Sequence, residues 1–227
     1  MRGKLIVIEG LDGSGKATQT ELLEEYLLRA GMPVKRLSFP DYAHPSSVLV
    51  QMYLKGEFGN HPEDVNAYGA SSFYAVDRYA SYLKFWKKDY EAGCILLADR
   101  YTTSNAIYQM TKLPQSQWYE YLDWLQDYEY GRLGLPQPDI TFYLDVSPEI
   151  SQQLITRRYH GDESKKDLHE RNREFLQQCH LTARFSAQKL EWSCIPCMAG
   201  TRLRSIQEIH DELTGKIREM IQPNYPL

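Results

Sequence analysis

The sequence predicts an α/β fold in which five parallel strands form a sheet that is covered by helices on both faces. Short apolar runs alternate with segments whose apolar residues recur at helical spacing, which is typical of parallel strands joined by crossover helices. The first apolar run is followed by a glycine-rich turn that opens a helix, as in a phosphate-binding loop. In such folds ligands bind outside the carboxyl ends of the strands.

The first half of the chain is expected to supply three of these strands. KLIVIEG (4–10) has the composition of a buried strand, and the helix that follows it ends near Gly31. PVKRLSF (33–39) is the second strand. The stretch 64–93 opens with polar residues, lacks proline and predicts a long helix, and CILLADRY (94–101) is the third strand.

The second half is expected to complete the sheet. Helical segments run to about Gly134, LPQPDITFYLDV (135–146) is the fourth strand, and Ser147 with Pro148 begins another helix. CIPCMA (194–199) is the fifth strand, and the proline within it indicates a sheet edge. SIQEIHDELTGKIREMI (205–221) is a closing amphipathic helix.

Composition narrows the classes of partner. The 227 residues are 42% hydrophobic, which predicts a single domain over 1–227. A net charge of −4 gives no general attraction to nucleic acid or to an anionic membrane, so the expected partners are small molecules. No apolar run is long enough to span a bilayer, and no leader pattern precedes the first strand, so we expect a cytoplasmic protein. Cys194 and Cys197 form a C-x-x-C without a second pair, which favours two ordinary strand cysteines over a zinc or redox site.

The glycine-rich turn predicts the nucleotide site. Glycines allow the backbone to turn its N–H groups toward phosphate oxygens, and a lysine can reach the β- and γ-phosphates. The position that normally supplies a Ser or Thr ligand to Mg²⁺ is Ala17, so we expect phosphate oxygens and waters to hold the metal, with Asp99 orienting the waters. The predicted ATP-binding residues are Gly10, Leu11, Asp12, Gly13, Ser14, Gly15, Lys16, Ala17 and Thr18.

Further candidates follow the third strand and lie on the long helix. Asp99 and Arg100 come at the carboxyl end of a central strand, where they either face a ligand or form a structural ion pair. Tyr74 lies four residues before Arg78, so an aromatic plane and a guanidinium share one helix face and could hold a base. Phe73 is the competing stacker. The stretch SNAIYQ adds Ser104, Asn105, Tyr108 and Gln109, which could instead be the polar face of an amphipathic helix.

Taken in order, these stretches resemble the thymidylate kinases, P-loop enzymes that phosphorylate dTMP. The resemblance covers almost the whole chain. It is carried by GLDGSGK, by FP at 39–40, by FYAVDR at 73–78, by DRYTTSNAIYQ at 99–109, by LPQPDITFYLDVSPE at 135–149 and by KKDLHE at 165–170. It implies a P-loop NTPase-type three-layer sandwich, Mg²⁺ with ATP as the phosphate donor, and a homodimer formed through the long helices.

The resemblance also implies roles for individual residues. Asp12 meets the sugar 3′-hydroxyl, Arg78 and Asn105 read the thymine edge, and Tyr74 stacks on its ring. Arg100 holds the acceptor phosphate behind a wall of Phe39 and Pro40, and Tyr108 lies against the ribose 2′ position. Ser104 and Gln109 complete the dTMP site.

The charged stretch 157–171 corresponds to a lid over ATP. Because Gly13 stands where some thymidylate kinases carry an arginine, the catalytic cation is expected from the lid, as Arg157 or Arg158, beside Lys16, Asp99 and Arg100. Two alternatives are open. A deoxynucleoside kinase of the same fold would need a base such as Glu9 near its hydroxyl acceptor, and a nucleotide-dependent switch would need no small acceptor. The same residues would also accept dUMP.

Overall fold

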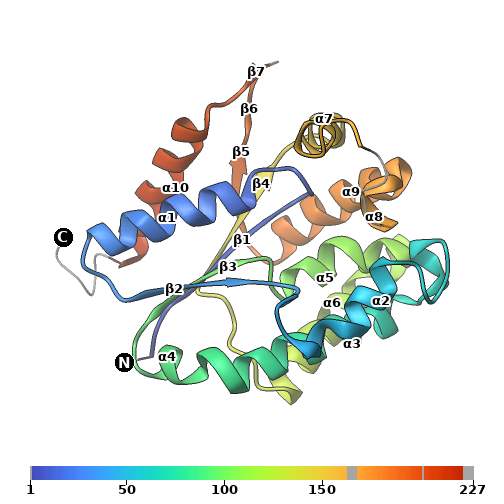
Figure 1. The fold of residues 1–227 in the computed structure, drawn as a ribbon, viewed down its shortest axis with the longest axis horizontal. Helices are drawn as coiled ribbons and strands as arrows, with labels where there is room; N and C mark the ends of the chain where they lie inside the picture. Colours follow the sequence, from blue (N-terminus) through green and yellow to red (C-terminus); the bar gives the residue numbers. More distant parts are fainter. Residues whose placement is uncertain (1, 163–167, 201, 222–227) are drawn as a thin grey trace.

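The computed structural model describes residues 2–162, 168–200 and 202–221, and its centre is a five-stranded parallel sheet in the order β2-β3-β1-β4-β5 (Figure 1). The predicted α/β class and the parallel sheet are confirmed. The strands are β1 (Leu5–Gly10), β2 (Val34–Ser38), β3 (Ile95–Asp99), β4 (Ile140–Asp145) and β5 (Ser193–Pro196).

The sheet has a hydrophobic layer on each face because side chains alternate along its central strand. On β1, Ile6 and Ile8 join a buried cluster with Leu23 of α1 and Leu213 of α10. Leu5 and Val7 face the other way and pack in a second buried cluster that includes Trp86. A continuous apolar strand is therefore buried on both sides, with α1 and α10 on one face and the α3–α4 region on the other (Figure 1).

Helices connect the strands and supply both layers. In the described residues none is long and apolar enough to cross a membrane. The helices are α1 (Lys16–Arg29), α2 (Val48–Leu54), α3 (Ala67–Ser81), α4 (Lys87–Glu91), α5 (Thr103–Tyr108), α6 (Trp118–Gln126), α7 (Pro148–Arg158), α8 (Leu168–Arg171), α9 (Arg173–Lys189) and α10 (Ile206–Ile221). Two π-helical segments, Tyr82–Trp86 and Asp127–Arg132, continue α3 and α6.

The long helix predicted over 64–93 begins later and is less regular than expected. Asn66 caps α3, and its side chain accepts a hydrogen bond from the Gly69 N–H at 2.8 Å. The helix then runs through the π-helical segment Tyr82–Trp86 into α4. The preceding helix α2 was not predicted, because it is only seven residues long and has no clear apolar period.

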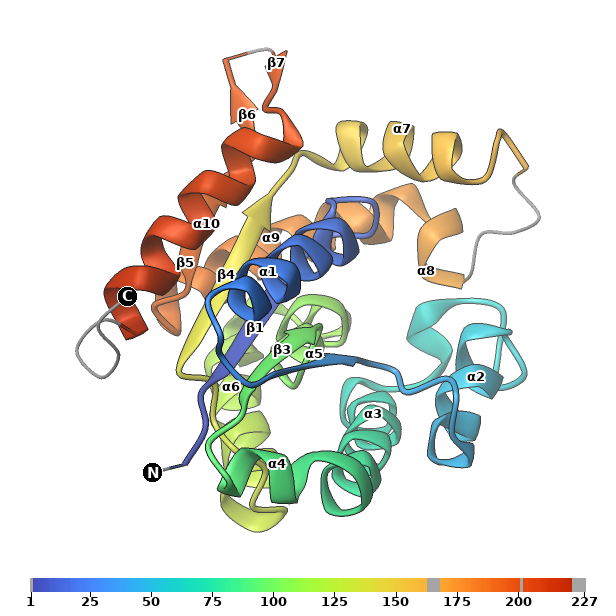
Figure 2. The ribbon, with the colours of Figure 1, turned by 60° about the vertical axis from the view of Figure 1, so that its left-hand side comes forward.

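The fifth strand ends earlier than the sequence predicts. β5 lies at the edge of the sheet and stops at Pro196, so the edge position inferred from that proline is confirmed. Beyond it, β6 (Met198–Ala199) pairs antiparallel with β7 (Arg202–Leu203) in a small hairpin that projects from the body (Figure 2). Cys194 is exposed, Cys197 is buried, and both thiols are free.

Candidate active site

The glycine-rich loop joins β1 to α1, and its lysine is folded onto the loop backbone. Gly15 precedes α1 with a left-handed φ of 92°, a conformation that glycine adopts without a Cβ clash. The Lys16 ammonium donates hydrogen bonds to the carbonyl oxygens of Gly10 and Leu11 at 3.0 and 2.9 Å. Burial and the neighbouring Arg100 lower the pKa of Lys16 to about 8. The loop therefore presents a cation and a helix N-terminus together, which suits a phosphate group.

Gly13 lies directly beneath α7. A Cβ at this position, where φ is +76°, would come within 2.8 Å of the Ser151 carbonyl oxygen and 3.0 Å of Ile155 Cγ1. The Ser151 hydroxyl also donates a hydrogen bond to the Asp12 carbonyl oxygen. Because α7 fills the space above the loop, position 13 cannot carry an arginine unless that helix moves.

A buried carboxylate holds the turn after β3. The Tyr101 N–H and the Thr103 hydroxyl donate hydrogen bonds to Glu9 at 3.1 and 2.7 Å. The Ser104 hydroxyl lies 2.9 Å from both oxygens of the same carboxylate. Burial raises the pKa of Glu9, although Arg100 opposes the shift. Within this turn Arg100 has a φ of 68°, which is unfavourable for a non-glycine residue and is maintained by the surrounding contacts.

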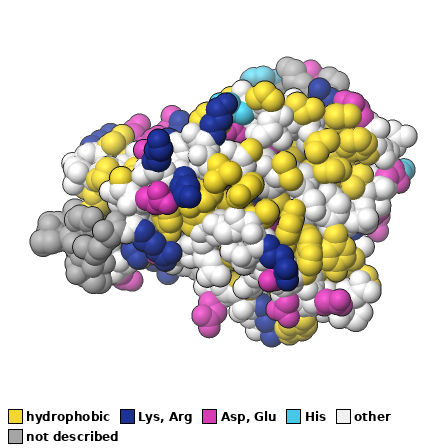
Figure 3. Space-filling view, turned by 90° about the horizontal axis from the view of Figure 1, so that it is seen from below, with side chains coloured by type: hydrophobic (Ala, Val, Ile, Leu, Met, Phe, Trp, Pro, Cys, Tyr) yellow, Lys and Arg dark blue, Asp and Glu magenta, His cyan; other side chains and the backbone are white. Residues whose placement is uncertain are grey.

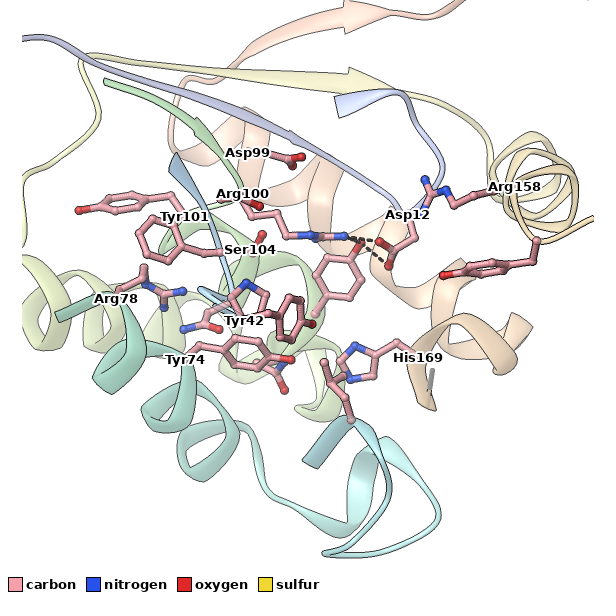
Figure 4. A pocket seen from close by; sticks show the side chains of 18 residues that line it. Asp12, Tyr42, Tyr74, Arg78, Asp99, Arg100, Tyr101, Ser104, Arg158 and His169 are labelled. Atoms are coloured by element: carbon pink, nitrogen blue, oxygen red, sulfur yellow. Dashed lines mark hydrogen bonds and ion pairs between the residues drawn. The ribbon is translucent and has the colours of Figure 1, made fainter. Parts of the chain in front are cut away.

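Arg100, Asp12 and Tyr108 form one polar cluster at the carboxyl end of β3 (Figure 4). The Arg100 guanidinium forms an ion pair with Asp12 and donates a hydrogen bond to the Tyr108 hydroxyl at 3.3 Å. The Tyr108 hydroxyl donates to Asp12 at 3.2 Å. Burial alone would raise the pKa of Asp12, but Arg100 and Lys16 outweigh it and lower that pKa to about 2. The cluster is thus an ionised pair at neutral pH.

A cavity of about 270 Å³ opens beside this cluster (Figure 4). Tyr74 and Arg78 both reach it from α3, whereas Phe73 packs on Phe58 with ring centroids 5.6 Å apart. Its wall includes the Phe39–Pro40 pair, whose peptide bond is cis. All ten residues predicted for the acceptor site line this cavity: Asp12, Phe39, Pro40, Tyr74, Arg78, Arg100, Ser104, Asn105, Tyr108 and Gln109.

At the far end of this cavity, Arg78 forms a buried ion pair with Glu129, which lies behind the wall and was not predicted from the sequence. Arg78 Nε and Nη2 donate to the two carboxylate oxygens of Glu129 at 2.8 and 2.6 Å. Asn105 Nδ2 donates to the same carboxylate at 3.0 Å. Arg78 and Glu129 are 1% and 0% exposed, and the carboxylate raises the pKa of Arg78 although burial alone would lower it.

A second cavity, of about 310 Å³, lies at the glycine loop and shares a wall with the first. It is lined by Lys16, Ala17 and Thr18, whereas Leu11 and Ser14 are buried within the loop. The four residues common to both cavities are Asp12, Asp99, Arg100 and Arg158.

Asp99 in the shared wall has a feature that suits a divalent cation. Its Oδ1 is buried and has no hydrogen-bond partner in the described part of the chain. An unpartnered carboxylate oxygen beside a phosphate site is a suitable ligand for Mg²⁺ or for its water shell. Ala17 offers only a methyl group, and Thr18 is exposed at the rim.

The structure separates the two predicted lid arginines. Arg158 lines both cavities and lies 3.9 Å from Glu170, whereas Arg157 lines a different cavity together with Gln153 and Arg173. The middle of the predicted lid, residues 163–167, lies outside the described residues, and so does part of the KKDLHE stretch.

The short helix α8 inserts His169 into the acceptor cavity. The His169 ring lies nearly parallel to the Tyr108 ring, at 11° with centroids 5.7 Å apart, and His169 Nε2 is 3.0 Å from the Tyr53 hydroxyl. Burial, with Lys112 and Arg100 nearby, lowers the pKa of His169 to about 3. His169 and Glu129 were both missed from sequence. His169 lay within a predicted charged loop, and Glu129 stands in a tyrosine-rich helical stretch with no motif around it.

Comparisons with known proteins agree with this geometry. The family model described as thymidylate kinase matches residues 8–211. The thymidylate kinase of Mycobacterium tuberculosis is 33% identical over 178 residues, covering 77% of this chain and 81% of the relative. That of Plasmodium falciparum is 28% identical over 220 residues, covering 96% and 91%.

One solved structure has the same fold over nearly the whole length. The structure of the thymidylate kinase from Candida albicans superposes with a TM-score of 0.66 at 23% identity. The match covers 98% of this chain and 92% of the other.

Proposed function

Because the chain belongs to the thymidylate kinase family, we propose that it transfers the γ-phosphate of ATP to dTMP, giving dTDP and ADP. The observation that carries this proposal is the wall shared by the two cavities. The phosphate-binding loop lies on one side of Asp12, Asp99, Arg100 and Arg158. The cavity lined by the residues predicted to bind dTMP lies on the other side. A phosphoryl group that crosses from donor to acceptor would pass these four side chains.

The donor side binds and neutralises the ATP phosphates. Backbone N–H groups at the start of α1 and the Lys16 ammonium would grip the β- and γ-phosphates, since Lys16 can exchange its two carbonyl partners for phosphate oxygens. Arg158 would supply the charge that matters most as the γ-phosphoryl group moves, because it borders both cavities.

The acceptor side positions dTMP. Arg100 would hold the acceptor phosphate after exchanging its Asp12 partner, and Asp12 would then be available to the sugar 3′-hydroxyl. Tyr108 and His169 form the wall near the sugar, and Tyr74 offers a face on which the base can stack. The acceptor oxygen belongs to a phosphate that is already ionised, so this reaction needs no strong base.

The state of Glu9 argues against the rival hydroxyl-phosphorylating reaction. A deoxynucleoside kinase needs a carboxylate free to take a proton from the 5′-hydroxyl. Glu9 is fully buried, does not line the acceptor cavity, and is held by donors from Tyr101, Thr103 and Ser104. A partner-binding switch is also disfavoured, because it would have no use for an acceptor cavity with a base-recognising wall.

Mg²⁺ would be held mainly by ATP phosphates and waters, with Asp99 as its protein carboxylate. When bound, it neutralises phosphate charge and polarises the transferring group. The protein's own part is to align the two substrates and to exclude water when the lid, at about 157–171, closes.

We extend the proposal to assembly and location. Residues 1–227 would act as one domain, and two copies would pair through the exposed apolar face of α3. Since ATP and dTMP are its small-molecule substrates, with neither nucleic acid nor membrane as a partner, a cytoplasmic location is expected, and cell fractionation would check it.

The test is a screen of acceptors with ATP, measured as ADP release. dTMP should be the preferred nucleoside monophosphate, dUMP should be weaker, and thymidine should be inert. Equal or faster phosphorylation of thymidine would overturn the proposal. Slow ATP hydrolysis that no monophosphate stimulates would instead support a switch.

A further inference from the structure

The buried Arg78–Glu129–Asn105 cluster fixes the hydrogen-bonding pattern at the end of the acceptor cavity. Arg78 and Asn105 line the cavity, whereas Glu129 stands behind them and does not. Arg78 Nη2 and Asn105 Nδ2 both donate to Oε1 of Glu129, at 2.6 and 3.0 Å. Because both groups donate to one oxygen atom, the Arg78 guanidinium and the Asn105 amide lie next to each other in the cavity wall.

Glu129 dictates which way the Asn105 amide faces. A carboxylate that is paired with an arginine can only accept hydrogen bonds, so the amide must turn its NH₂ group toward Glu129. The same nitrogen lies 3.4 Å from the Ser71 carbonyl oxygen, which also accepts. The reversed amide would place its oxygen against both acceptors. The Asn105 side-chain carbonyl is therefore the atom available to a ligand.

The same carboxylate fixes the guanidinium. Nε and Nη2 of Arg78 are bonded to Glu129, and Nη1 has no hydrogen-bond partner among the described residues. On these two neighbouring side chains, Arg78 Nη1 therefore remains as a donor and Asn105 Oδ1 as an acceptor.

We propose that Glu129 is a positioning residue that makes this site select 4-oxo pyrimidines and refuse 4-amino pyrimidines, an inference that rests on the proposed kinase function. Thymine and uracil present an acceptor, O4, beside a donor, N3–H, which complements the wall. Cytosine presents the reverse, a donor at N4 and an acceptor at N3. Its donor would therefore face the Arg78 donor, and its acceptor would face the Asn105 acceptor. Buried polar groups left unpaired in this way are strongly unfavourable.

The location of Glu129 fits this role. It lies in the π-helical segment Asp127–Arg132, where an extra residue per turn alters the direction of side chains, and such segments are frequent at functional sites. Its nearest partner in sequence, Asn105, is 24 residues away, so the contact is tertiary and serves the cavity wall.

The experiment compares dTMP with 5-methyl-dCMP, which differs from it only in the 4-amino group and the N3 proton. In the unmodified protein, kcat/KM for dTMP should exceed that for 5-methyl-dCMP by at least about 10³-fold. Glu129→Gln keeps the shape but adds an NH₂ donor, so the Asn105 amide can reverse. The ratio of kcat/KM for dTMP to that for 5-methyl-dCMP should then fall by at least about tenfold, while KM for ATP stays unchanged. Glu129→Asp, which can still only accept, should keep most of the discrimination.

The outcomes separate the inference from the proposed function. Asp139→Asn is the matched control, because Asp139 is a partly buried carboxylate that pairs with Lys4 and does not line the acceptor cavity. It should leave the ratio unchanged even if it lowers thermal stability. An unchanged ratio in Glu129→Gln would overturn the inference while dTMP kinase activity stands. Should that variant fail to fold, Glu129→Asp decides: retained discrimination supports the inference and lost discrimination contradicts it. If the unmodified protein does not phosphorylate dTMP, the function itself fails.

Discussion

At the scale of a single residue, the backbone conformation of Arg100 depends on the buried carboxylate of Glu9. The sequence context of Arg100 allowed either a ligand contact or a structural ion pair with Asp99, but the structure pairs Arg100 with Asp12 instead, at the wall of the acceptor cavity. The unusual φ of 68° is stabilised by Glu9, which accepts hydrogen bonds from three of the four residues after Arg100, namely Tyr101, Thr103 and Ser104. The ion pair is therefore compatible with function, because an incoming phosphate can replace the carboxylate at the same guanidinium.

Asp99 and Thr18 give the sharpest test of how the metal is held without a hydroxyl at position 17. Asp99→Asn removes a negative charge from an otherwise unpartnered carboxylate, so Mg²⁺-dependent kcat should fall by about tenfold or more. Thr18→Ala should change it by less than about twofold, since Thr18 is exposed at the rim. The measurement is a Mg²⁺ titration of turnover at saturating ATP and dTMP. A severe defect in Thr18→Ala, with Asp99→Asn near normal, would reverse the metal assignment.

Arg157 and Arg158 are a matched pair, adjacent in α7 but lining different cavities. Arg158→Ala should lower kcat by about 10²-fold or more with a smaller effect on KM, because its charge is needed most in the transition state. Arg157→Ala should stay within a few-fold of the unmodified protein. Steady-state kinetics for both substrates checks this. Equal, mild effects of the two changes would mean that the cation comes from another residue.

Sequence reasoning found the residues whose neighbours in the chain reveal their chemistry. Lys16 lies in a recognisable loop, and Tyr74 with Arg78 shares a helix face, so their place in the site was predictable from spacing. Glu129 could not be found in this way, because its partner Arg78 is 51 residues away and the contact exists only in the folded chain. Glycine at position 13 was noted as a departure, but its reason, the close approach of α7, required the structure.

At the scale of elements, α8, which belongs to the proposed lid, shows how a very short helix is held in place. α8 has four residues, too few to be stable alone, and it depends on contacts to the body. Gln152 Nε2 donates to the Glu170 carbonyl oxygen at 3.1 Å, the Tyr159 hydroxyl donates to the Glu170 carboxylate at 3.2 Å, and His169 is inserted among aromatic rings. Since burial lowers the pKa of His169, we expect the docked position of α8 to favour the neutral imidazole.

The lid should therefore loosen in acid. The pKa of His169 is about 3 when docked, against 6.5 in its solvated form, so below pH 6.5 the open lid binds a proton that the docked lid does not. The docking equilibrium should weaken by up to about tenfold per pH unit from about 6.5 down to about 3. Burial lowers the pKa of Lys112 to about 7, so this nearby lysine becomes charged at the start of this pH range and repels a protonated His169. Asp12 and Arg100 keep their charges over the range.

Hydrogen exchange of the α8 amides, corrected for the intrinsic effect of pH, measures this docking. Protection should fall between pH 7.5 and pH 5.5 in the unmodified protein. His169→Phe keeps an aromatic ring but cannot titrate, so its protection should change much less. A pH dependence that survives in His169→Phe would show that another group controls the lid.

The predictability of elements follows from what stabilises each of them. β1, β3 and β4 are continuous apolar runs, and α10 has a strong apolar stripe, so their pattern alone indicated them. By contrast, α2, α8 and the β6–β7 hairpin are too short to show a recognisable period of hydrophobic residues in the sequence. The π-helical segments depend on tertiary contacts such as the Glu129 ion pair, which local propensity does not contain.

At the scale of the whole molecule, the order of the strands creates the site. In the sheet, β1 lies between β3 and β4. The phosphate-binding loop that follows β1 therefore lies next to Asp99 and Arg100 at the carboxyl end of β3. The helices on one face carry the base-recognising side chains, and α7 covers the loop from the β4 side. Because α3 carries Arg78 and Tyr74, it must be held firmly for these side chains to keep their positions in the cavity wall.

That requirement leads to the prediction about assembly. α3 buries Arg78 on its inner side but exposes Val76 and, just beyond its end, Leu83 to 48% and 51%. Figure 3 shows hydrophobic side chains gathered on the face of the molecule seen from below, the side on which α3 and α4 lie in Figure 1. Exposed apolar side chains on one helix face are typical of interfaces, and we expect the occupant here to be a second copy of this chain.

Changing Val76 and Leu83 together to Asp should convert the expected homodimer into a monomer, because two carboxylates would have to be desolvated in the interface. The dimer dissociation constant should rise by at least about 100-fold, measured by analytical ultracentrifugation. Leu28→Asp is the control, since Leu28 is equally exposed but lies on α1, and it should leave the dimer intact. A monomeric unmodified protein at micromolar concentration, or a double variant that still dimerises, would contradict this assembly. Because the interface backs the helix that carries Arg78, the monomer should also show a higher KM for dTMP with little change in KM for ATP.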